Sequence, residues 1–214
     1  MFDGLRAELD ALGLTPFDVQ LADEKVPVAP LEGALRLRAA DGGGFVLESV
    51  DYGVGYPLGR AETEPEARAV LLAYVGQPLP AVQPISRADL DRLVGRVARH
   101  YFDLRDRVRA AGDAGLAITL PPELPVDRVG ALDGTEVYPV ETPFGLRALG
   151  PWSLRPENDL HTFVTATDVP VNAAIKHAWF GQPGGGLRFR LAEPGVGLRD
   201  LVARGALRRI YVSG

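Results

Sequence analysis

The sequence contains no cysteine, only two lysines and no long apolar run, and each shortage excludes a class of proteins. Without cysteine the chain has neither disulfides nor a cysteine nucleophile. The only lysines are Lys25 and Lys176, which disfavours chemistry through a lysine Schiff base. No stretch approaches the roughly 18 apolar residues that a membrane-spanning helix requires. The first residues mix acidic with apolar side chains and lack the apolar core of a signal peptide. We therefore expect a cytoplasmic protein, or one exported by a signal-independent route, that has no membrane partner.

The charge balance also limits the partners. The formal net charge of the 214-residue chain is −5, which argues against a nucleic-acid-binding protein because such proteins usually carry a basic face. Three dispersed histidines without cysteine disfavour a zinc site. We therefore predict no metal ion and no cofactor.

The first 80 residues predict a small α+β module of unknown role. Apolar residues at helical spacing indicate a helix over residues 2–12. Three alternating segments at 17–22, 34–40 and 44–53 predict strands of a small antiparallel sheet. A capping box, Thr63-Glu64-Pro65-Glu66, predicts a helix that reaches about Val75.

Residues 81–115 are expected to form a linker and a connecting helix. The segment 76–86 is rich in proline and is typical of a linker. Ser86 then predicts the cap of a long amphipathic helix that reaches about Ala111. His100 on this helix is interpreted as structural, because no second histidine lies four residues away.

Residues 116–214 predict a compact, mostly β domain with an open cleft. Turn-forming residues separate short apolar segments, and strands are expected at 159–167, 185–192 and 207–213. One short helix is expected at 197–204 before Gly205. The fold class is therefore α+β, with an N-terminal α+β module, a long connecting helix and a β-rich C-terminal domain.

The stretch "AWFGQPGGGLRF", residues 178–189, contains the most unusual pattern. Three successive glycines, Gly184 to Gly186, weaken a strand, so they indicate a backbone that passes close to something bulky. A long hairpin loop is the alternative interpretation. The side chain of Gln182 can donate and accept hydrogen bonds at once, which suits a carboxamide or a ribose hydroxyl.

Four other residues could take part in chemistry. Arg128 and Arg147 lie in loop-like sequence, and their planar guanidinium groups suit a diphosphate, although ordinary surface arginines are the alternative. Tyr138 is compatible with core packing, and His161 with a structural role at a strand edge.

Taken in order, these segments resemble the tuberculosis necrotizing toxin family. The resemblance covers roughly residues 118–214, and Trp179 to Gly186 is its most specific element. The family's Asp-Arg-aromatic-Gly element falls on residues 127–130, and its Thr-Pro-Phe…Arg-Ala-Leu element on 142–149. The resemblance implies an NAD⁺ glycohydrolase toxin that cleaves NAD⁺ or NADP⁺ into nicotinamide and the ADP-ribose product, with an immunity protein as a further partner. It implies catalytic roles for Arg128, Tyr138, His161 and Gln182. It implies substrate-binding roles for Val129, Arg147, Phe180, Gly184 and Gly185.

One departure keeps other interpretations open. Val129 occupies the position where the family has an aromatic residue, so a surface for stacking nicotinamide is absent at this point. This substitution favours the alternative of a binding module that holds NAD or a partner without turnover. A third interpretation, a structural adaptor, applies if the N-terminal module carries the function.

Overall fold

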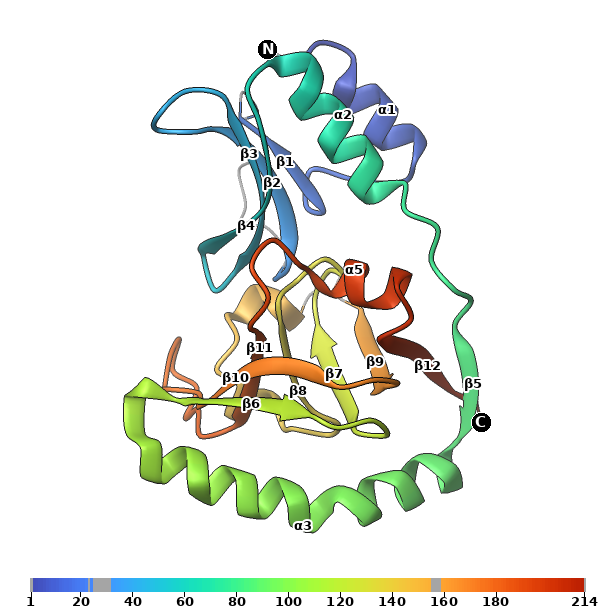
Figure 1. Ribbon diagram of the computed structural model, residues 1–214, viewed down its shortest axis with the longest axis vertical. Helices are drawn as coiled ribbons and strands as arrows, with labels where there is room; N and C mark the ends of the chain where they lie inside the picture. Colours follow the sequence, from blue (N-terminus) through green and yellow to red (C-terminus); the bar gives the residue numbers. More distant parts are fainter. Residues whose placement is uncertain (1, 23, 25–31, 155–158, 214) are drawn as a thin grey trace.

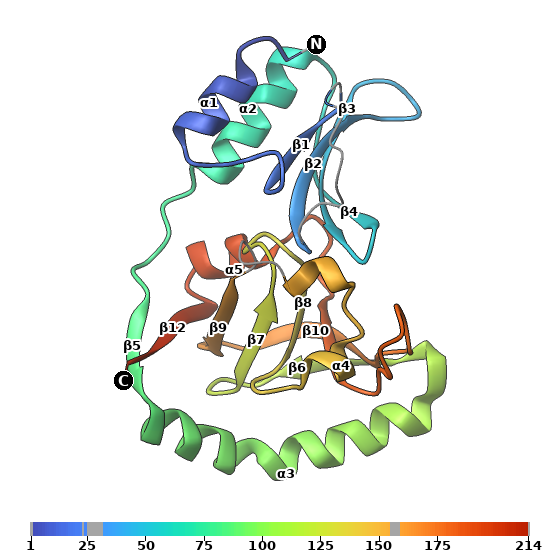
Figure 2. The same cartoon turned by 180° about the vertical axis from the view of Figure 1, so that it is seen from behind.

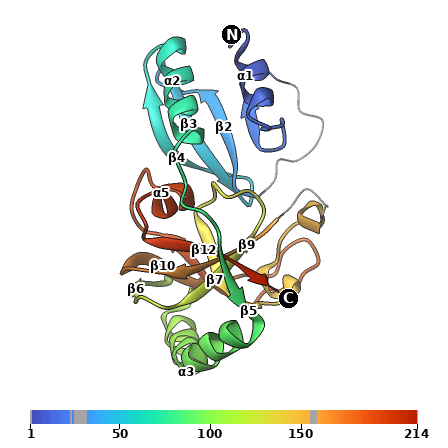
Figure 3. The same cartoon turned by 90° about the vertical axis from the view of Figure 1, so that its right-hand side faces the viewer.

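The computed structural model describes residues 2–22, 24, 32–154 and 159–213, which form two separate sheets arranged along the long axis of the molecule (Figure 1). The N-terminal sheet has the strand order β1-β2-β3-β4, and helices α1 and α2 lie side by side against it. The C-terminal sheet has eight strands, and the long helix α3, seen nearly end-on in Figure 3, lies at the end of the molecule away from the N-terminal sheet. The predicted α+β class with a β-rich C-terminal region is confirmed. The elements of the N-terminal module are α1 (Leu5–Ala11), β1 (Val19–Leu21), β2 (Ala34–Ala39), β3 (Phe45–Asp51), β4 (Val54–Ala61) and α2 (Glu64–Val75).

The N-terminal sheet differs from the expected one in two respects. Strand β1 pairs with β2 in the parallel direction, because alternation within a strand does not determine the direction of its neighbour. Strand β4 was not predicted from the sequence. None of its residues is fully buried, so it lacks the apolar alternation that reveals a half-buried strand.

Two helices close the core of the N-terminal module. The predicted capping box of α2 is present, since Thr63 accepts a hydrogen bond from the backbone of Glu66 while the Glu66 side chain returns to Thr63. Leu5 and Leu9 of α1 are fully buried against this core, whereas Leu12, expected on the same stripe, is 57% exposed. The helix ends at Ala11, so Leu12 no longer follows the helical stripe.

The C-terminal sheet has the order β5-β12-β9-β7-β8-β11-β10-β6. Residues 83–86, expected in the linker, instead form β5, which pairs in parallel with β12. Five of these eight strands, β5 among them, were not predicted, because they lie within or beside segments rich in turn formers. The elements are β5 (Gln83–Ser86), α3 (Arg87–Ala111), β6 (Leu116–Leu120), β7 (Pro125–Val129), β8 (Glu136–Pro139), α4 (Phe144–Arg147), β9 (Leu160–Thr165), β10 (Val169–Ile175), β11 (Leu187–Leu191), α5 (Leu198–Ala203) and β12 (Leu207–Ser213), with short 3₁₀ turns at Gly112–Ala114 and Pro151–Leu154.

Helix α3 is a layer of the C-terminal half. It spans 25 residues from Arg87 to Ala111, as predicted, and the hydroxyl of Ser86 accepts a hydrogen bond from the backbone of Asp89 at 3.1 Å. Its apolar face packs on the C-terminal core, and the hydroxyl of Tyr101 donates to the carbonyl of Pro125 at 2.8 Å. Among the described residues, no helix is both long and apolar enough to cross a membrane.

The two halves meet where the turn between β3 and β4 points toward the C-terminal sheet (Figure 2). The N-terminal core contains residues from 2 to 75 only, and the C-terminal core residues from 79 onward. The contact between the halves is instead made largely by polar groups, and these groups surround the candidate site.

Candidate functional site

Residues 179–186, hereafter the signature loop, lie between β10 and β11 and begin with a tight turn. Trp179 and Gln182 exchange two backbone hydrogen bonds, of 3.1 and 2.8 Å. Between them, Phe180 and Gly181 have φ values of 47° and 73°. This is the two-residue turn in which both central residues are left-handed, a conformation that glycine and asparagine adopt more readily than phenylalanine.

Glycines in the second half of this loop allow its backbone to pack directly against the backbone of neighbouring segments. The amides of Gly184 and Gly186 donate to the carbonyls of Gly145 and Leu146, each at 3.0 Å. A Cβ at Gly186 would lie 2.6 Å from the Leu146 oxygen, and one at Gly184 would lie 2.6 Å from the backbone of residues 176–177. The bulky neighbour that the sequence indicated is therefore the α4 turn.

Helix α4 holds Arg147 in a buried position. Its guanidinium group lies 2.7 Å from the carboxylate of Asp127 and donates to the carbonyl of Thr142 at 2.8 Å. It also lies over the ring of Tyr138, 5.1 Å from the ring centre. Burial raises the pKa of Asp127, and the charge of Arg147 opposes that rise. The Arg147–Asp127 pair thus fixes the position of both side chains.

Arg128, on β7, is paired with a carboxylate from the other half of the molecule. Its guanidinium group lies 3.1 Å from Asp51 at the end of β3, and both side chains are almost fully buried. It also donates to the carbonyl of Glu136 at 3.1 Å. Side-chain atoms at Gly33 or Gly134 would collide with this guanidinium group, so the two glycines leave the space that it occupies. Asp51 accepts two further hydrogen bonds from Thr135, at 2.7 and 2.9 Å.

Two tyrosine hydroxyls meet beside these arginines. Tyr138 on β8 hydrogen-bonds to Tyr52, the residue that follows Asp51, and the hydroxyl of Tyr52 donates to the carbonyl of Arg147 at 2.8 Å. Burial raises the pKa of both hydroxyls above the usual range, so they stay protonated. A cavity of only about 10 Å³ remains among these groups. Its lining consists of Glu32, Asp51, Tyr52, Arg128, Val129, Glu136, Tyr138 and Leu149.

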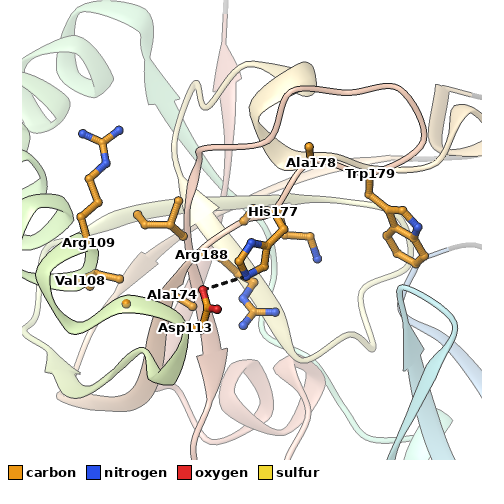
Figure 4. A pocket seen from close by; sticks show the side chains of 11 residues that line it. Val108, Arg109, Asp113, Ala174, His177, Ala178, Trp179 and Arg188 are labelled. Carbon is orange, nitrogen blue, oxygen red and sulfur yellow. Dashed lines mark ion pairs between the residues drawn. The ribbon is translucent and has the colours of Figure 1, made fainter.

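A larger hollow of about 550 Å³ lies between the end of α3 and the signature loop. Figure 4 shows His177 directed at Asp113, 3.6 Å away, and Trp179 at the opposite side of the hollow. Three cationic side chains, Arg109, Lys176 and Arg188, also line it. The Lys176 ammonium lies 2.8 Å from the ring centre of Tyr52, and burial lowers its pKa to about 8. The hollow can therefore attract an anion.

A family model described as tuberculosis necrotizing toxin matches residues 119–210. Residues 119–210 are a domain of this family, hereafter the toxin-family domain. A solved structure of tuberculosis necrotizing toxin complexed with its immunity factor is 21% identical, with a TM-score of 0.37. The match covers 45% of this chain and 58% of that one. No curated protein matches the chain.

Within this toxin-family domain, most predicted site residues lie together. Arg128, Val129 and Tyr138 line the small cavity, and Arg147 contacts Tyr138. His161 on β9 lies directly opposite Arg128 in the strand register, and burial together with the Arg128 charge lowers its pKa to about 4. His161 is therefore neutral at physiological pH.

The remaining predicted residues belong to the signature loop of the toxin-family domain. The Gln182 side chain is half-buried beside Gly145 of α4. Phe180 is 42% exposed, with its ring edge-on to Trp152 at 4.6 Å between centres. Gly184 is buried in the contact with α4, and Gly185 is half-buried.

Sequence reasoning did not identify Asp51, Tyr52, Lys176 or Arg188 as neighbours of the site. The one local signal was the Asp-Tyr-Gly turn sequence, which indicates a hairpin but not what the hairpin contacts. In the described part of the chain, no group of three or more histidine or acidic side chains is arranged to hold a metal ion.

Proposed function

We propose that the toxin-family domain is an NAD⁺ glycohydrolase, which hydrolyses the nicotinamide–ribose bond of NAD⁺ or NADP⁺ and acts as a toxin. The observation that carries the proposal is the clustering of Arg128, Tyr138 and Arg147 around one buried pocket. These residues come from separate segments of the domain, and the loop with Gln182 packs on the α4 turn that holds Arg147. Such a concentration of polar groups in a buried position is typical of a functional site.

The chemistry requires orientation and charge stabilisation more than proton transfer. The nicotinamide of NAD⁺ is a cationic leaving group that departs neutral, so the bond breaks without a strong general acid. Water then attacks the oxocarbenium-like ribose. The protonated hydroxyl of Tyr138 would donate a hydrogen bond to the substrate, and Gln182 would orient the reacting ribose or the carboxamide. His161, being neutral, would help to hold Arg128, which lies opposite it in the strand register.

The diphosphate of the substrate would bind in the large hollow. Arg147 is already neutralised by Asp127 within the same domain, so we assign it a positioning role instead of the diphosphate contact expected from the sequence. The hollow supplies Arg109 and Lys176, whereas Arg188 is already paired with Glu136 at 2.9 Å. The volume of the hollow, about 550 Å³, is within the usual range for ligand sites, roughly 300–1,000 Å³. The exposed rings of Trp179 and Phe180 offer stacking surfaces that Val129 does not provide.

Substitution of Gln182 tests the proposed function. Gln182→Ala removes one donor and one acceptor without leaving a core cavity. We expect kcat for NAD⁺ hydrolysis to fall about 100-fold, as when a preorganised polar contact to a transition state is lost. The melting temperature should be unchanged. Gln83→Ala, at an exposed glutamine on β5, is the matched control and should retain full turnover. Wild-type turnover that persists in Gln182→Ala would exclude this residue from the mechanism.

A binding module without turnover is the second candidate, and Val129, at the position where the family has an aromatic residue, favours it. Calorimetric binding of NAD⁺ without release of nicotinamide by any variant would support this candidate. A structural adaptor is the third, and it would show neither binding nor turnover. For the first two candidates, we also propose that an immunity protein binds the toxin-family domain, that residues 1–80 form a module with a separate role, and that the protein is cytoplasmic or exported by a signal-independent route.

A further inference from the structure

We propose that the turn between β3 and β4 is a built-in inhibitor of the toxin-family domain, in which Asp51 and Tyr52 occupy the place of the substrate. The inference rests on the proposed function, because it concerns the same pocket. It assigns a role to the N-terminal module, which carries no cluster of catalytic groups of its own in the part of the chain that the structure describes.

The polar contacts of the turn are those that a substrate would make. Asp51 presents a carboxylate to the guanidinium group of Arg128 at 3.1 Å, so this arginine is not free to contact a substrate. The hydroxyl of Tyr52 contacts Tyr138 and donates to the carbonyl of Arg147. The ring of Tyr52 stacks on Trp179 with 5.6 Å between ring centres, and Lys176 lies against it. One dipeptide thus engages five groups of the candidate site.

The conformation of the turn is one that tyrosine adopts unfavourably. Asp51 and Val54 form the last pair of the hairpin, so Tyr52 and Gly53 are its two turn residues. Their φ values are 54° and 75°. The first position of such a turn favours asparagine, aspartate or glycine, and another residue there costs on the order of 1 kcal/mol. The contacts of the tyrosine side chain with the C-terminal half offset that cost.

The dimensions of the pocket support the same conclusion. A space of about 10 Å³ holds at most one water molecule, so no nucleotide can reach Arg128 and Tyr138 in this arrangement. Tyr52 lines this small space, and its ring also contacts Lys176 and Trp179, two residues that line the 550 Å³ hollow. Withdrawal of the turn would remove this ring from the pocket and leave Arg128 without its carboxylate.

The N-terminal module also contacts the C-terminal half outside the pocket. The ring of Tyr56 on β4 lies under Arg190, 4.6 Å from its guanidinium carbon. Gln77 donates to Asp200 at 3.0 Å, and Arg199 donates to the carbonyl of Val75 at 3.1 Å. These contacts allow the module to be loosened without altering the pocket itself.

The experiment uses the full chain with two substitutions of different kinds. Tyr52→Asn removes the ring and hydroxyl and suits the left-handed turn position, so the hairpin should fold. Tyr56→Ala loosens the interface outside the pocket. Tyr211→Ala, at an exposed tyrosine on β12, is the matched control. We measure kcat/KM for NAD⁺ and, by calorimetry, the Kd for NAD⁺. Both interface variants should show at least a tenfold rise in kcat/KM and tighter binding, whereas the control should equal the wild type.

The outcomes separate this inference from the proposed function. If no protein hydrolyses NAD⁺ but both interface variants bind it more tightly than the control, the inhibitory turn is supported and the glycohydrolase proposal fails. If turnover and binding in the interface variants equal or fall below the wild type, while their melting curves show a folded protein, the turn is not an inhibitor. A loss of turnover in both would show instead that the N-terminal module completes the site.

Discussion

At the scale of single residues, the N-terminal module places more negative charge at the pocket than Arg128 alone can balance. Glu32 is only 5% exposed, and its carboxylate accepts a hydrogen bond from the backbone of Tyr52 at 2.7 Å. Burial, followed by the neighbouring charge of Asp51, raises the pKa of Glu32 to about 7. Glu136 also raises it, and Arg128 opposes the rise. Ionisation of Glu32 therefore lowers the stability of the folded protein.

The stability of the protein should depend on the protonation of Glu32. Between pH 4.5 and about 7 the folded chain holds a proton that the unfolded chain has lost, so stability falls as pH rises through this window and stays lower above it. Glu32→Gln keeps an acceptor for Tyr52 and removes the charge. At pH 8 it should raise the free energy of unfolding by roughly 2 kcal/mol, and it should flatten the pH profile. Urea titrations from pH 4.5 to 8 provide the measurement, with the exposed Glu62→Gln as control. Parallel profiles for wild type and Glu32→Gln would contradict the assignment.

At the scale of elements, two hairpin turns with an aromatic residue in a left-handed position meet at the site. One contains Tyr52 and belongs to the N-terminal module; the other contains Phe180 and belongs to the signature loop. Trp179 stacks on Tyr52 and contacts Phe180, so it links both turns. The signature loop is held in place by the close contact of Gly184 and Gly186 with α4. Its precise conformation therefore depends on residues that touch no substrate.

Gly186 should be indispensable for that contact. Its φ is not in the left-handed region, so an added methyl group acts only by collision with the Leu146 carbonyl, 2.6 Å away. Gly186→Ala should cost about 1–3 kcal/mol of stability, the usual penalty for overpacking. It should also reduce turnover, because α4 carries Arg147. Gly42→Ala is the matched control, since a Cβ there meets nothing within 4 Å. Equal melting temperatures for the two variants would refute the role given to the contact.

The same elements show how far the sequence predicts the structure. Helices α2 and α3 were predicted with accurate ends because their caps and apolar faces are local signals. Strands β4 and β5 were not, since few of their residues are buried and their pairing depends on distant strands. In the site, short motifs indicated Arg128 and Arg147. The partner of Arg128 lies 77 residues earlier in the chain, and no local pattern encodes a contact of that length.

At the scale of the whole molecule, two halves with separate hydrophobic cores are joined by an interface in which a buried ion pair is central. Asp51 and Arg128 are 2% and 3% exposed in their side chains, and they belong to different sheets. Removing one member of such a pair leaves an uncompensated buried charge, which typically costs about 3–5 kcal/mol. We therefore expect the pair to specify how the two halves dock.

A double-mutant cycle on this pair tests whether the halves are coupled through it. Asp51→Ala and Arg128→Ala should each destabilise the protein by about 3–5 kcal/mol, while the double variant should lose little more than either single variant. The exposed pair Arg87–Glu141 is the matched control, because its atoms are as close, 2.8 Å, but its side chains are 60% and 55% exposed. Its coupling energy should stay below about 1 kcal/mol. Denaturant titrations of the six variants and the wild type give both coupling energies. If the Asp51–Arg128 coupling is as small as that of the control, the buried pair does not hold the two halves together, and the docking of the N-terminal module must depend on its contacts outside the pocket.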